Sequence, residues 1–151
     1  MPRFRRRCVQ LAAAGSELVN ELRACLDTGP LIAHLRARQG RSSPLTGLAD
    51  HEWVVSSLTV LEVWRGARED EFEATAALIA ACTVVELTGE LAEHAGRLCV
   101  RMRALGRTLG AADAAIATTA LAVTARLWTT NAKDFVDVPG LAVVPVVLNL
   151  A

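Results

Sequence analysis

The stretch ACLDTGPLI, residues 24–32, decides the fold of this 151-residue chain. Its apolar start reads as the end of a short buried strand over residues 22–26, and Asp27 follows that strand directly. Thr28-Gly29-Pro30 then fits the start of a helix, because proline is favoured in the first helical turn. A strand that passes at once into a helix is the unit from which parallel sheets are built.

The same alternation continues along the chain. We expect further strands at residues 53–57, 83–87, 126–130 and 141–146, with helices between them. Alternating strands and helices predict a three-layer α/β/α sandwich with a mostly parallel central sheet. Pro145 favours an edge position for the last strand, because proline cannot donate to a ladder. The expected domain covers residues 21–151, preceded by a flexible or peripheral N-terminal extension at residues 1–20.

The composition excludes some classes of protein. Hydrophobic residues make up 52% of the chain and its mean hydropathy is +0.33, yet no apolar run reaches the roughly 18 residues of a membrane span. The arginine-rich start superficially mimics a signal peptide, but its apolar stretch is short and Gln10 interrupts it. We therefore interpret the protein as cytoplasmic. The formal net charge is +0, so only local patches can attract a charged partner.

Three acidic residues lie at the turning points between expected strands and helices: Asp27, Glu62 and Asp113. Ligands of parallel α/β sheets bind outside the carboxyl ends of the strands, and a hard divalent cation prefers oxygen ligands. Each acid also has a structural interpretation. Asp27 could cap a helix, Glu62 could pair with Arg65 or Arg68, and Asp113 could serve the macrodipole of its helix.

The fourth expected strand ends in a polar run, TTNAKDF at residues 129–135. Its hydroxyl and amide groups could contact a metal-bound water or a phosphate. Ordinary turn chemistry would explain the same residues.

Four segments in consistent order resemble the PIN domain, and specifically the VapC-type toxin ribonucleases of bacterial toxin–antitoxin pairs. They are LDT at residues 26–28, SLTVLEVWRGA at residues 57–67, ADAAIATTA at residues 112–120 and LWTTNAKDF at residues 127–135, with VPGL at residues 138–141 as a further likeness.

The resemblance implies an endoribonuclease that depends on Mg²⁺ or Mn²⁺. It carries the metal-binding, catalytic carboxylates over onto Asp27, Glu62 and Asp113. The fourth acidic position of the family matches Asn131, which departs from a carboxylate; Asp134 could compensate, although it better fits the following turn. Thr28 and Thr129 are further candidates for this site, as residues that contact the metal-binding carboxylates and not the metal itself. Gly29-Pro30 stands where the family leads us to expect a small polar residue.

The resemblance also implies partners. The substrate would be RNA, such as a loop of tRNA or rRNA whose unstacked bases can be read, and a cognate antitoxin would neutralise the protein, which we expect to be a homodimer. The candidate contacts for RNA phosphates are Arg36, Arg38, Arg41, Arg65 and Arg68. Two alternatives remain: a catalytically silent PIN fold that binds RNA or protein, which Asn131 keeps open, and an α/β scaffold in which the acids are structural.

Overall fold

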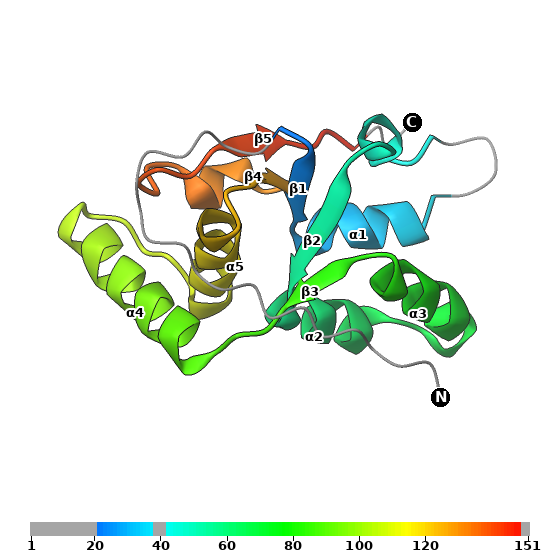
Figure 1. Ribbon diagram of the computed structural model, residues 1–151, viewed down its shortest axis with the longest axis horizontal. Helices are drawn as coiled ribbons and strands as arrows, with labels where there is room; N and C mark the ends of the chain where they lie inside the picture. The colour runs from blue at the N-terminus through cyan, green and yellow to red at the C-terminus, as the bar shows by residue number, and fades with distance from the viewer. Residues whose placement is uncertain (1–20, 38–41, 149–151) are drawn as a thin grey trace.

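A computed structural model describes residues 21–37 and 42–148 of the chain (Figure 1). Five strands form one sheet in the order β3-β2-β1-β4-β5, and every neighbouring pair is parallel. The strands are β1 at Arg23–Leu26, β2 at Glu52–Ser56, β3 at Thr83–Val85, β4 at Arg126–Thr129 and β5 at Val143–Pro145. The predicted parallel sheet is confirmed, and Pro145 lies on an edge strand as expected.

Helices connect the strands as the alternation predicts. The α-helices are α1 at Thr28–Leu35, α2 at Ser57–Gly66, α3 at Phe72–Ala80, α4 at Gly89–Ala104 and α5 at Ala111–Ala122. Three short 3₁₀ turns complete the elements: η1 at Thr46–Leu48, η2 at Glu69–Glu71 and η3 at Ala132–Phe135. The expected extension at residues 1–20 lies outside the described residues, as do Arg38 and Arg41.

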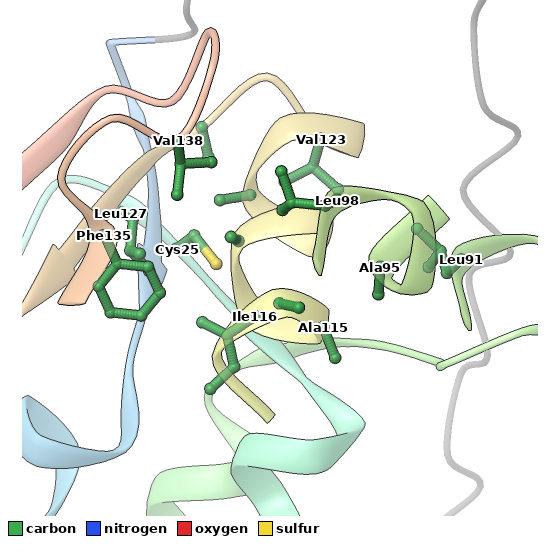
Figure 2. Close-up of a cluster of buried hydrophobic side chains, with 14 of the residues drawn as sticks. Cys25, Leu91, Ala95, Leu98, Ala115, Ile116, Val123, Leu127, Phe135 and Val138 are labelled. Atoms are coloured by element: carbon green, nitrogen blue, oxygen red, sulfur yellow. The ribbon is translucent and has the colours of Figure 1, made fainter. Parts of the chain in front are cut away.

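The sheet has a separate apolar core on each face, because successive strand residues point to opposite faces. In β1, Cys25 joins the core under α4 and α5, whereas Leu26 joins the core under α1, α2 and α3. Figure 1 shows α4 and α5 on one side of the sheet and α1 and α3 on the other. In Figure 2, Ile116 of α5 lies on the strand side and Leu98 of α4 beyond that helix. The predicted three-layer sandwich is thereby confirmed.

Helix caps fix where each strand turns into a helix. The Asp27 side chain caps α1 by accepting from the Thr28 backbone N–H at 2.7 Å. The Ser56 side chain caps α2 by accepting from the Leu58 backbone N–H at 3.2 Å. Because β2 ends at Ser56 and the helix begins at once, the strand end and the cap coincide. A membrane-spanning helix needs a long apolar stretch, and the described part of the chain contains none that meets this requirement.

Candidate active site at the carboxyl edge of the sheet

Asp27 lies where β1 ends, at the centre of the sheet, and is 9% exposed. One carboxylate oxygen accepts from the Thr28 N–H and the other accepts from the Thr129 hydroxyl at 2.6 Å. Burial raises the pKa of Asp27, the two hydrogen bonds lower it, and the charges of Glu62 and Asp134 raise it again. Asp27 is therefore both a helix cap and a rigidly held acid that shares its surroundings with other acids.

Glu62, on α2, is half-buried beside Asp27. The Thr28 hydroxyl donates to its Oε2 atom at 2.5 Å, which joins the start of α1 to α2. The arginine partner proposed for Glu62 is not found among the described residues, because Arg68 pairs with Glu71 at 2.7 Å and with Asp70 at 3.8 Å. A threonine hydroxyl orients this carboxylate without neutralising its charge.

Asp113, in the first turn of α5, is also half-buried. Burial raises its pKa most, and the charges of Asp27, Asp134 and Glu62 raise it further, in that order. Those three carboxylates come from the end of β1, from η3 and from α2, so the fold brings four segments that are distant in sequence to one edge. A carboxylate in the first turn also interacts favourably with the helix macrodipole. Asp113 can have this structural role and still be available to a metal ion.

Asn131 and Asp134 close the edge after β4. The Asn131 N–H donates to the Thr129 hydroxyl at 3.0 Å, and its side-chain amide donates to Asp134 Oδ2. Phe135, only 2% exposed, anchors the turn that carries Asp134. Asp134 lies in the turn η3, as expected, and its charge also raises the pKa of Asp27 and of Asp113.

The donor set of this edge suits a hard cation. Asp27, Glu62, Asp113 and Asp134 supply only oxygen ligands, which Mg²⁺ and Mn²⁺ accept readily. Every charge that shifts the pKa of Asp27 or Asp113 belongs to another carboxylate. Within residues 21–37 and 42–148, however, no three acidic, histidine or cysteine side chains stand close enough to form a ready ligand set. Ionised carboxylates repel one another, so a tight cluster requires a counter-charge.

The candidate phosphate-binding arginines differ in their contacts. Arg36 approaches Glu71 at 3.6 Å and donates to the Gly66 carbonyl at 3.4 Å, and Arg68 pairs with the same glutamate. Arg65 is exposed on α2, one turn beyond Glu62. Of the candidates that the structure describes, Arg65 is the one for which no carboxylate contact is found.

Comparisons with known proteins agree with this architecture. Residues 24–141 match the PIN domain. Ribonuclease VapC19 of Mycobacterium tuberculosis, in strains CDC 1551 / Oshkosh and ATCC 25618 / H37Rv, is 34% identical over 118 residues, which cover 77% of this chain and 94% of that protein.

Solved structures of toxin–antitoxin complexes share the fold. A DNA-bound VapBC complex from Salmonella typhimurium contains a chain with a TM-score of 0.71 at 20% identity, covering 83% of this chain and 99% of that one. A toxin–antitoxin complex from Klebsiella pneumoniae gives a TM-score of 0.67 at 25% identity, covering 82% and 98%.

Proposed function

The chain belongs to the PIN-domain family, and on that premise we propose that it is a VapC-type toxin, a divalent-metal-dependent endoribonuclease that a cognate antitoxin neutralises. The observation that carries this proposal is that Asp27 and Asp113 have other acids of the carboxyl edge, Glu62 among them, as their charged neighbours. These acids are the catalytic residues, and they would hold Mg²⁺ or Mn²⁺.

The chain's own residues prepare the site in three ways. The Thr28 N–H and the Thr129 hydroxyl hold both oxygens of Asp27, while the Thr28 hydroxyl holds Glu62. Asn131 holds Asp134, so a carboxylate stands at the edge although the fourth family position is an amide. When bound, a divalent cation supplies Lewis-acid activation of water and of the scissile phosphate. Fixed ligands reduce the reorganisation that this chemistry requires.

RNA reaches the edge through its phosphates. Carboxylates alone repel a polyanion, so basic side chains near the edge have to contribute. Arg65 is best placed, since it follows Glu62 by one helical turn and is exposed. Arg36 and Arg68 would first have to leave Glu71.

An apolar hollow between the end of α1, β2 and α3 is the proposed binding place for the antitoxin. It has a volume of about 390 Å³ and is lined by His34, Leu35, Trp53, Ala74, Ala77, Leu78 and Ala81. Apolar side chains of a partner helix commonly fill such grooves. A cytoplasmic location and a homodimer complete the proposal, which we base on the family resemblance.

The test is cleavage of defined RNAs by the purified protein. We expect cleavage with Mg²⁺ or Mn²⁺, loss of cleavage in EDTA, and recovery when either ion is restored. A catalytically silent RNA-binding module would bind the same RNAs and cleave none of them under any of these conditions. Protection of the RNA by a co-purified antitoxin would extend the result to the partner.

A further inference from the structure

Thr28, Thr129 and Thr130 lie where the neighbouring strands β1 and β4 end, and two of their three hydroxyls donate to acids. The Thr28 hydroxyl donates to Glu62, and the Thr129 hydroxyl donates to Asp27. Thr129 is 0% exposed, whereas Thr130, the next residue, is exposed. Among the described residues, no hydrogen-bond partner is found for the Thr130 hydroxyl. Its two neighbours in sequence both donate to carboxylates, Thr129 to Asp27 and Asn131 to Asp134.

Gly29 makes room for this hydroxyl. A Cβ atom built on Gly29 would overlap the Thr130 Oγ1 atom and would stand 3.3 Å from its Cβ and 3.4 Å from its Cγ2. The backbone does not require glycine at this position, because the described glycines with a positive φ are Gly106 and Gly140. A larger residue at position 29 would therefore have to displace one side chain, that of Thr130.

Thr130 directly follows Thr129, which donates to Asp27, and the chemistry of its hydroxyl limits what it can bind. A hydroxyl carries no charge and can donate to a phosphate oxygen while leaving the acids free for a cation. Contacts of this kind position a nucleic acid without reading its sequence.

We propose that Thr130 is a substrate-positioning residue that donates to an RNA phosphate at the rim of the acidic edge. Gly29, which has no Cβ, leaves the space that this hydroxyl occupies. The inference rests on the proposed function. It singles out one hydroxyl of the polar run at residues 129–135 as the phosphate contact, and it adds a steric pairing that can be tested without RNA.

The first experiment compares Thr130→Val, which keeps the shape and removes the hydroxyl, with Thr130→Ser, which keeps the hydroxyl. For Thr130→Val we expect KM for RNA cleavage to rise about 3- to 10-fold, the size of one neutral hydrogen bond, with kcat nearly unchanged. Thr130→Ser should recover most of the lost affinity. If Thr130→Val and wild type have the same KM, the proposed phosphate contact does not exist.

Salt dependence separates this role from that of an arginine. A neutral hydroxyl releases no counterion, so Thr130→Val should weaken RNA binding without changing the slope of log K against log salt. Arg65→Gln should reduce that slope by about 0.7, the value per neutralised phosphate of a single strand. Binding is measured with Ca²⁺ in place of Mg²⁺ and with the Asp113→Asn background, so that cleavage does not enter. A changed slope in Thr130→Val would contradict the proposal.

The second experiment tests the steric pairing by melting temperature. Gly29→Ala should lower Tm and raise KM, because the new methyl group displaces the Thr130 side chain. In the double variant Gly29→Ala/Thr130→Ala, Tm should recover while KM stays high, since the overlap is gone and the hydroxyl is also gone. Unchanged Tm and KM in Gly29→Ala would overturn the pairing. If wild type itself cleaves no RNA with either metal, the proposed function fails, and the melting comparison still decides whether Gly29 positions Thr130.

Discussion

The two ends of this sheet treat acidic residues in opposite ways. At the amino end, acids are matched with arginines: Glu52, at the start of β2, bonds Arg23 at 3.0 Å, and Glu21 pairs with Arg126 at the start of β4. At the carboxyl end, Asp27 and Asp113 have other carboxylates as their charged neighbours.

The difference separates charges that support the fold from charges that serve a function. Exposed ion pairs such as Arg23–Glu52 contribute about 0–1 kcal/mol each. Half-buried like charges oppose folding, and a chain tolerates them where a ligand of opposite charge completes the site. The hydroxyls of Thr28 and Thr129 hold the acids of the carboxyl end in position but leave their charge intact.

Asp113→Asn tests this comparison with the largest expected effect. Loss of one metal-binding carboxylate should reduce RNA cleavage by roughly 10³-fold, which corresponds to several kcal/mol of lost charge stabilisation. The variant should melt no lower than wild type without metal, because one like charge has been removed. Cleavage rate and Tm in EDTA are the two measurements. Cleavage at the wild-type rate would exclude Asp113 from the reaction.

The pH dependence of stability is a second test of the like charges at the carboxyl end. The pKa of Asp113 is raised in the fold, so its carboxyl favours folding when protonated, and that contribution is lost as pH rises through the raised pKa. The Tm advantage of Asp113→Asn over wild type should therefore be larger at pH 8 than at about pH 4.

Glu52→Gln is the matched control at the amino end. It breaks a pair between opposite charges and should lower stability by no more than about 1 kcal/mol while RNA cleavage stays unchanged. Glu52→Gln should thus lower Tm slightly and leave cleavage unchanged, whereas Asp113→Asn should reduce cleavage strongly and not lower Tm. If Glu52→Gln impaired cleavage as strongly as Asp113→Asn, the distinction between the two ends would be wrong.

Asp134→Asn sharpens the comparison with an intermediate effect. The variant keeps the hydrogen-bonding shape of the turn and removes one charge from the edge. We expect the Mn²⁺ concentration for half-maximal cleavage to rise about 10-fold, within the 10–100-fold range of residues that support a metal site. The increase in Tm caused by Mn²⁺ should shrink in parallel. An unchanged metal requirement would assign Asp134 to the turn alone.

The sequence predicted the parallel sandwich because strand and helix patterns alternate cleanly from residue 22 onward. It also predicted where Asp27 and Asp113 belong, since each stands at the junction of an apolar element and a turn. The contacts that orient the acids could not be predicted in this way. The bond from Thr28 to Glu62 and that from Thr129 to Asp27 span 34 and 102 positions. The clash that Gly29 avoids with Thr130 likewise depends on how β1 and β4 pair.

Removal of residues 1–20 is expected to have the smallest effect. It tests whether these residues contribute to the stability of the domain or to RNA cleavage. The PIN match starts at residue 24, and Glu21 already contributes to the pair with Arg126. A chain starting just before Glu21 keeps both ion pairs of the amino end and every residue of the carboxyl edge. Its cleavage rate and Tm should therefore match those of the full chain, within the few tenths of a kcal/mol typical of distant surface changes. A large loss of Tm with cleavage intact would place the first twenty residues in the structural end of the sheet, and a loss of cleavage with Tm intact would place them at the functional end.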